Sequence, residues 1–119
     1  MRNQQAKGIP ECGESCPAEA TVAAIGGRWK IFILWHLYRG KLRFSELRRK
    51  VPGISQKMLT EQLRQLEGHG LLTRTVYAEV PPKVEYAATS LGESLRPVVT
   101  AMGDWGRRHG DKITRKSKG

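Results

Sequence analysis

A group of polar side chains between positions 55 and 67 has the chemistry needed to recognise nucleic acid. Its members are Gln56, Lys57, Thr60 and Arg64. Amide, ammonium, hydroxyl and guanidinium groups form hydrogen bonds with base edges in the major groove of duplex DNA. Three leucines, Leu59, Leu63 and Leu66, recur at helical spacing in the same segment, so a helix would turn them inward and the polar group outward. The pattern predicts a helix that reads a DNA sequence, although each polar residue alone would also suit an ordinary solvated surface.

Three further residues are expected to hold the phosphate backbone. Ser55 suits the N-cap of this helix, where a helix N-terminus can bind a phosphate. Arg43 lies at the start of the preceding helix and Lys83 at the expected hairpin tip, where cations supply affinity rather than specificity. A solubilising turn residue is the alternative for Lys83, and Arg74 and Glu85 are expected to form a cross-strand salt bridge in the same hairpin.

The titratable residues do not form the pattern of an enzyme. His36 lies in an apolar segment typical of a core histidine, His69 in a helix-ending turn and His109 in a basic tail. None of them has a nucleophile and a carboxylate partner nearby in the sequence. Cys12 and Cys16 lack the further ligands that a closed zinc site needs. We therefore expect no catalytic site, no metal and no cofactor.

The composition suits one basic domain. The chain has 119 residues and a formal net charge of +10, enough for a single core and favourable to a polyanionic partner. The longest apolar run, Ile31 to Trp35, is far too short to span a bilayer. The N-terminal segment lacks the apolar stretch of a secretory signal, so we expect a cytoplasmic protein with reduced cysteines.

Turn signals and apolar periodicity divide the chain into helices and one hairpin. We expect helices over 17–25, 28–38, 44–51, 56–68 and 90–106, and strands over 71–80 and 84–89. Pro97 is expected to bend the last helix. Two helices joined by a Pro52-Gly53 turn and followed by a hairpin indicate a winged helix-turn-helix. The fold class is therefore α+β and mainly helical, with a two-stranded hairpin wing and terminal helices that dimerise. We expect a flexible N-terminal arm over 1–15, the domain over 16–106 and a basic flexible tail over 107–119.

An apolar stripe on the last expected helix has no later element to cover it. The stripe comprises Leu95, Val98, Val99, Met102 and Trp105. Uncovered apolar surface is typical of a subunit interface, so a homodimer is expected. Packing against the chain's own core is the alternative. For the function, the alternative is a winged helix that binds proteins and has no sequence-specific DNA binding.

From Cys16 to about Leu95 the chain resembles the HxlR family of winged-helix regulators, relatives of the MarR-type repressors. The resemblance is carried by CPAEATVAAIGGRWKIFILWHL, RFSEL, PGISQKMLTEQLRQLEGHGLLTR and EVPPKVEY. It implies a dimeric regulator of transcription, expected to be a repressor, whose paired recognition helices enter successive major grooves of an inverted repeat. It also implies that the first and last helices form the dimer interface. Ala88 departs from the family, where a larger apolar residue is common.

The same resemblance bears on the cysteines. Some members of the family sense electrophiles or oxidants through a cysteine just before the first helix, the position of Cys16. Cys12 lies four residues away, near enough to form a disulfide with an oxidised Cys16. We expect that oxidation or alkylation of Cys16 would alter the dimer and its DNA affinity. An incidental thiol without a sensing role is the alternative.

Overall fold

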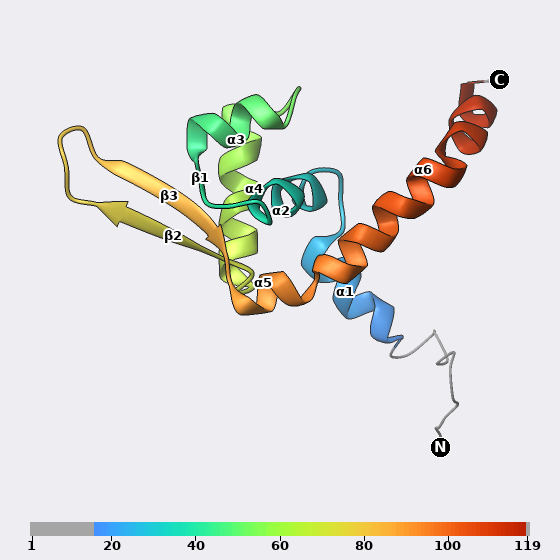
Figure 1. Ribbon diagram of the computed structural model, residues 1–119, viewed down its shortest axis with the longest axis horizontal. Coiled ribbons are helices and arrows are strands. Elements are labelled where there is room, and N and C mark those ends of the chain that lie inside the picture. Colours follow the sequence, from blue (N-terminus) through green and yellow to red (C-terminus); the bar gives the residue numbers. More distant parts are fainter. Residues whose placement is uncertain (1–15, 119) are drawn as a thin grey trace, which may run out of the picture.

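The computed structural model describes residues 16–118, as six helices and three strands in the order of a winged helix-turn-helix (Figure 1). The elements are α1 (Pro17–Ile25), α2 (Lys30–Leu37), β1 (Leu42–Arg43), α3 (Phe44–Lys50), α4 (Gln56–Gly68), β2 (Leu72–Tyr77), β3 (Lys83–Ala88), α5 (Ser90–Ser94) and α6 (Arg96–Lys118). The predicted class, a mainly helical α+β winged helix-turn-helix, is confirmed. The expected N-terminal arm, with Cys12, lies outside the described residues.

The core forms where α2, α3 and α4 meet the base of the sheet. Ile33 and Leu34 of α2, Leu47 of α3 and the three leucines of α4 are almost fully buried in it. Burial of such side chains stabilises the fold by about 1.5–3 kcal/mol each. α2 is less buried than its composition predicted, because Phe32 on its outer side is 49% exposed. The outer side of α2 is therefore available to another element or another molecule.

The wing is a three-stranded antiparallel sheet in the order β1-β3-β2, one strand more than the predicted hairpin. β1 pairs with β3 through Leu42 opposite Tyr86. A strand of two residues is too short to show an alternating pattern, so the sequence did not indicate it. β1 ties the wing to the first helix of the helix-turn-helix, because α3 begins at the next residue.

The predicted salt bridge between Arg74 and Glu85 is wrong. Arg74 lies opposite Tyr86, one position away from Glu85, so the two charged side chains leave opposite faces of the sheet. Arg74 instead pairs with Glu67 of α4, with Nε 3.8 Å from Oε1, and Glu85 pairs with Lys41 at 3.5 Å. Arg74 therefore joins the wing to α4 rather than strand to strand.

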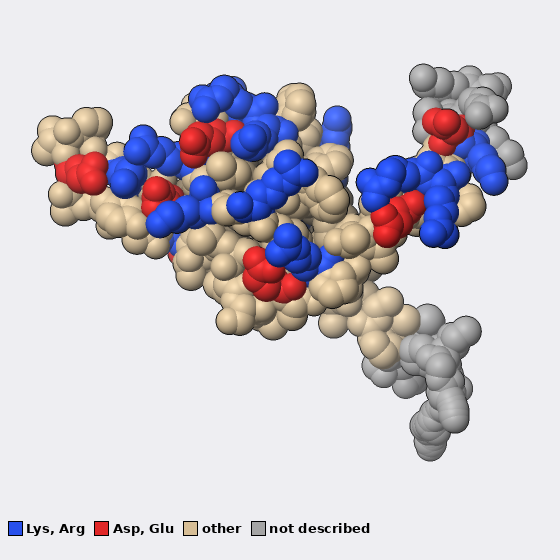
Figure 2. All heavy atoms as spheres, viewed as in Figure 1, with Lys and Arg blue, Asp and Glu red and all other residues tan. Residues whose placement is uncertain are grey.

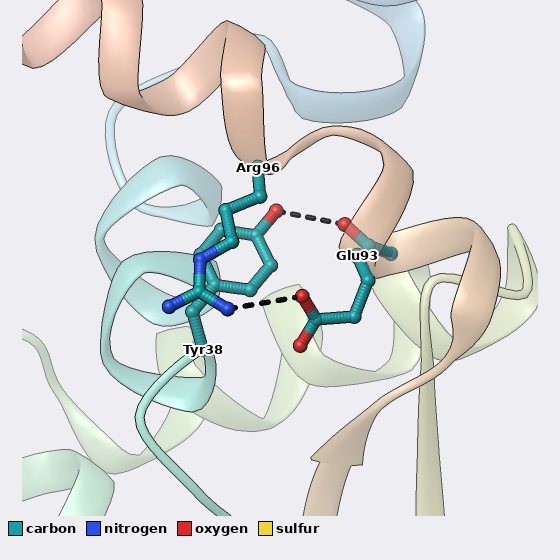
Figure 3. Close-up of polar contacts among 4 residues, drawn as sticks. Tyr38, Glu93 and Arg96 are labelled. Carbon is teal, nitrogen blue, oxygen red and sulfur yellow. Dashed lines mark hydrogen bonds and ion pairs between the residues drawn. The ribbon is translucent and has the colours of Figure 1, made fainter.

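The last helical segment is divided into α5 and α6, which meet at Leu95. Pro97 is the second residue of α6, where its missing N–H needs no partner, so it does not bend the helix as expected. The Tyr38 hydroxyl donates a hydrogen bond to the Gly92 carbonyl at 2.8 Å, and burial raises the pKa of this hydroxyl. The Arg96 guanidinium lies over the Tyr38 ring and pairs with Glu93 at 3.3 Å (Figure 3). These contacts connect the end of α2 to the junction of α5 and α6.

α6 projects away from the rest of the domain (Figure 1). It continues to Lys118, so residues 107–118 are helical where the sequence analysis expected a flexible tail. A basic composition is compatible with this helix. Arg and Lys are good helix formers, and a basic segment that follows a helix can prolong it.

Candidate nucleic-acid interface

α4, the second helix of the helix-turn-helix, is positioned by its N-cap and its leucines. The Ser55 Oγ accepts a hydrogen bond from the Met58 N–H at 3.0 Å, which confirms the predicted N-cap. In the turn before it, Gly53 has a φ of 87°, a conformation that side-chain-bearing residues rarely adopt. The three leucines of α4 are buried, as predicted. The opposite side of α4 is consequently turned toward solvent.

The outer face of α4 brings the four predicted base-reading residues together. Gln56, Lys57 and Arg64 are exposed, and Thr60 is half-buried. Together with Glu61 they line one open concavity of about 450 Å³. The Thr60 hydroxyl donates to the Gln56 carbonyl at 2.9 Å, so its oxygen keeps lone pairs that can accept a further hydrogen bond. The face therefore offers donors and acceptors of the kinds that base edges require.

α4 is also held against α2 by a polar contact that the sequence analysis missed. The Lys30 side chain is only 7% exposed, and its Nζ donates to Gln62 Oε1 on α4 at 2.9 Å. Burying an ammonium group is costly unless a hydrogen bond compensates for the lost water. Lys30 lies in an apolar segment and Gln62 on an otherwise polar helix, so neither pattern indicated the pair. The contact joins α4 to the first residue of α2.

Arg43 lies in β1, at the N-cap of α3, with its side chain exposed. Its backbone N–H donates to Glu46 Oε1 at 2.8 Å, which begins α3 and leaves the guanidinium outside the cap. Other exposed cations surround it on α3 and on the turn before β1. They are Arg39, Lys41, Arg48, Arg49 and Lys50. Figure 2 shows these elements covered by Lys and Arg, a wider basic surface than the single arginine that the sequence analysis assigned.

Lys83 is not at the tip of the wing, contrary to the sequence analysis. It is the first residue of β3 and pairs with Tyr77, so the loop comprises residues 78–82 and contains both prolines. The ladder reaches Lys83 because this residue, unlike the prolines before it, has an N–H. Its Nζ lies 4.7 Å from the centre of the Tyr77 ring, within the range of a cation–π contact. Lys83 is half-buried on the side of the wing, which still leaves its ammonium group near the surface.

His36 lies on α2 and is only half-buried, so it is not the core histidine that the sequence predicted. Burial, assisted by the Lys50 and Arg39 cations, lowers the pKa of His36. The imidazole is therefore mostly neutral at pH 7 and adds little to the positive charge of this face. The described residues contain no group of three or more acidic, cysteine or histidine side chains that could hold a metal.

The predicted dimer stripe is split by the fold. Val99 is 1% exposed and belongs to the chain's own core, which corrects its assignment to an interface, and Leu95 is partly buried against that core. Val98, Met102 and Trp105 remain exposed at 39%, 48% and 54%. Val99 differs from the exposed residues of the stripe because it faces α2. It lines an apolar groove of about 280 Å³ between α2 and α6. We call the three exposed residues, together with Phe32 of α2, the α6 patch.

Cys16 is the N-cap residue of α1, immediately before Pro17, and is half-buried. The expected start of the first helix is thus confirmed, and so is its end before Gly26. No helix within residues 16–118 combines the length and apolar character needed to cross a membrane.

Comparisons with known proteins agree on one family. The model of the HxlR-like helix-turn-helix family matches residues 24–114. The HTH-type transcriptional regulator YdeP of Bacillus subtilis is 52% identical over 100 residues, which cover 84% of this chain and 78% of YdeP. The regulator YtfH of Escherichia coli is 44% identical over 103 residues, which cover 87% of this chain and 82% of YtfH.

Solved structures give the same result. The redox regulator HypR in its reduced form has a TM-score of 0.79 at 47% identity, covering 83% of this chain and 98% of that one. The transcriptional regulator YodB of B. subtilis, in its reduced form, has a TM-score of 0.68 at 39% identity. The match covers 77% of this chain and 91% of the YodB chain.

Proposed function

The chain belongs to the HxlR family of helix-turn-helix transcriptional regulators, and from this premise we propose that it is a repressor that binds an inverted-repeat operator as a homodimer. The family is one of DNA-binding regulators and not of enzymes. In the proposed complex the two α4 helices of the dimer enter successive major grooves, and each wing lies against the neighbouring backbone. Gln56, Lys57, Thr60 and Arg64 read bases, while Ser55, Arg43 and Lys83 contact phosphates.

The single observation that supports this proposal is the outer face of α4. Its polar side chains share one concavity and stand on the side opposite the buried leucines. A helix of this length can lie in a major groove, and its first turns then face the bases. The surrounding cations would attract the duplex from any direction on this side of the domain.

The proposed dimer is supported by the α6 patch. Its apolar residues lie on two helices, with a groove between them, and α6 extends well beyond the core. Met102 and Trp105 are i and i+3 on α6, so they present one continuous apolar edge to a partner helix. A twofold arrangement of α1 and α6 would cover this edge and set the distance between the two α4 helices.

Redox control through Cys16 is part of the proposal. HypR and YodB are both similar in structure to this chain. HypR is named a redox regulator, and YodB was also solved after treatment with diamide. A two-electron oxidant would convert the Cys16 thiolate to a sulfenic acid, and a second thiol such as Cys12 would then displace water to form a disulfide. Because Cys16 begins α1, such a bond would displace α1 relative to α6 and so change the dimer.

The proposed function predicts a salt-dependent preference for one duplex sequence. Selection of bound duplexes from a random pool should yield an inverted repeat with half-sites about one helical turn apart. The logarithm of the binding constant should fall with the logarithm of salt concentration by about 0.9 per neutralised phosphate. Fluorescence anisotropy with the selected duplex measures both. A chain that bound no duplex at low salt would instead be a winged helix that binds proteins.

A Cys16→Ser variant tests the redox part separately. Treatment with diamide should reduce the affinity of the unsubstituted chain for its duplex by tenfold or more, and reductant should restore it, whereas the variant should keep its affinity throughout. The measurement is the same anisotropy titration before and after treatment, with Cys12→Ser as the second variant. An identical response of the Cys16→Ser variant and the unsubstituted chain would remove Cys16 from the proposal.

A further inference from the structure

A second polar pocket lies beside the outer face of α4, between that helix and the wing. It has a volume of about 310 Å³ and is lined by Thr60, Leu63, Arg64, Glu67, Arg74 and Tyr86. Thr60 and Arg64 also line the concavity on α4, so the two hollows adjoin through these residues. The second half of α4 passes the base of the wing in Figure 1, and α4 contacts β2 there.

Tyr86 contributes an unusual hydroxyl to this pocket. The residue is only 8% exposed, and its hydroxyl has no hydrogen-bonding partner among residues 16–113, whose side chains the structure describes. The other buried tyrosine, Tyr38, does have such a partner. A buried polar group without a partner is uncommon in native proteins and usually indicates a functional role or a bound molecule. Burial is the main cause that raises the pKa of Tyr86, so the phenol keeps its proton at neutral pH and can donate it to an acceptor.

The charges around Tyr86 favour an anionic acceptor. Arg74 and Arg64 both interact electrostatically with the Tyr86 hydroxyl, and so does Glu67. Glu67 pairs with Arg74 at 3.8 Å, which leaves the charge of Arg64 uncompensated among the described residues. The pocket contains two guanidinium groups and one phenol but only one carboxylate. It therefore offers mostly hydrogen-bond donors. Arginine and a hydroxyl are the groups that commonly hold a phosphate.

We propose that Tyr86 and Arg74 bind a phosphate group in the pocket between α4 and the wing, with the positive charge of the base-reading Arg64 beside it. The proposal rests on the proposed DNA-binding function for its first source of phosphate, the backbone of the duplex whose bases lie against α4. A free phosphate anion is the second source with the same chemistry. In either case the Tyr86 hydroxyl donates to a phosphate oxygen, and Arg74 spans from Glu67 to the same group. Tyr86 thus has a binding role in addition to its place in the core.

The test compares Tyr86→Phe, which removes the hydroxyl and keeps the buried ring, with the matched variant Tyr77→Phe on the same wing. Tyr86→Phe should weaken the selected duplex and a random duplex alike, by roughly tenfold, as expected for one lost hydrogen bond to a charged group. Tyr77→Phe should leave both affinities unchanged. Single operator phosphates can be replaced by uncharged methylphosphonates. At one position, the phosphate that Tyr86 contacts, the unsubstituted chain and Tyr86→Phe should bind the modified duplex with equal affinity.

Glu67→Gln provides a test of opposite sign. Removal of the carboxylate that lines the pocket should strengthen duplex binding several-fold, because Arg74 is released to the phosphate. Glu93→Gln, the same change on α5, should have a smaller effect. If Glu67 served only to hold α4 against the wing, Glu67→Gln would weaken duplex binding, because the contact with Arg74 would be loosened.

Inorganic phosphate distinguishes the two sources. In NMR spectra of the protein alone, a titration with phosphate at constant ionic strength should shift the Nε–Hε signal of Arg74 if the pocket takes a free anion, and Tyr86→Phe should abolish that shift. Weaker duplex binding by Tyr86→Phe without such a shift assigns the pocket to the DNA backbone. If the unsubstituted chain bound no duplex, the proposed function would fail while the phosphate titration still decided the pocket. Unchanged duplex affinity together with unchanged arginine signals overturns the proposal.

Discussion

Met102→Glu is expected to separate the proposed dimer and to reduce the affinity for the selected inverted repeat by about a hundredfold or more. Met102 is 48% exposed and lines the groove between α2 and α6, at the centre of the α6 patch. A carboxylate placed there would have to be desolvated against apolar surface in the dimer. Once the subunits separate, each half-site is bound alone and the advantage of two linked contacts, on the order of 10²–10⁴, is lost.

Sedimentation and anisotropy measure the two effects on the same samples. Leu91→Glu is the control, because Leu91 is a comparably exposed apolar residue on α5, outside the α6 patch. It should leave both the oligomeric state and the affinity unchanged. Circular dichroism should give the same helix content for both variants and the unsubstituted chain. A Met102→Glu variant that sedimented as a dimer and bound normally would show that the α6 patch is not the interface.

Lys57→Ala and Thr60→Ala are each expected to relax sequence preference by roughly 1–3 kcal/mol, which is the cost of one good base contact. Both side chains lie in the concavity on the outer face of α4 and neither is needed by the core. The affinity for the selected duplex should therefore fall while that for a random duplex changes much less. Competition between the two duplexes measures the ratio directly.

The matched control for these variants is Lys83→Ala. Lys83 lies on the side of the wing, so its ammonium can meet only the backbone in the proposed complex. Its loss should weaken the selected and random duplexes equally. If all three variants lowered both affinities by the same factor, α4 would have no part in reading bases.

Local patterns predicted α4 well for an identifiable reason. Ser55, the leucines at helical spacing and the glycines that follow are signals contained within one short segment, and the leucines can reach the core from only one side of a helix. The outward position of Lys57 and Arg64 followed from the same constraint. α1 was predicted equally well, since Pro17 and Gly26 mark its two ends.

Errors arose where two segments meet. The partner of Arg74 depends on the register of β2 against β3 and on how close α4 lies, and a shift of one residue decides which face a side chain takes. Val99 was assigned to an interface because it belongs to the same apolar spacing as Met102. In the fold α2 covers Val99, whereas Met102 stays exposed. The strand β1 has only two residues, so its pairing partner is what makes it a strand.

By itself the amino-acid order determined helices α1 to α4, the hairpin, the inward face of α4 and the basic character of the chain, because helix caps, turns and apolar periodicity act between residues close in sequence. Tertiary structure alone decided which charged groups pair, which apolar residues stay exposed on α6, and that Tyr86 meets Arg64 and Arg74 in one pocket. Those outcomes depend on distances between segments far apart in the chain, and a difference of one residue in register or a few ångströms in packing reverses them.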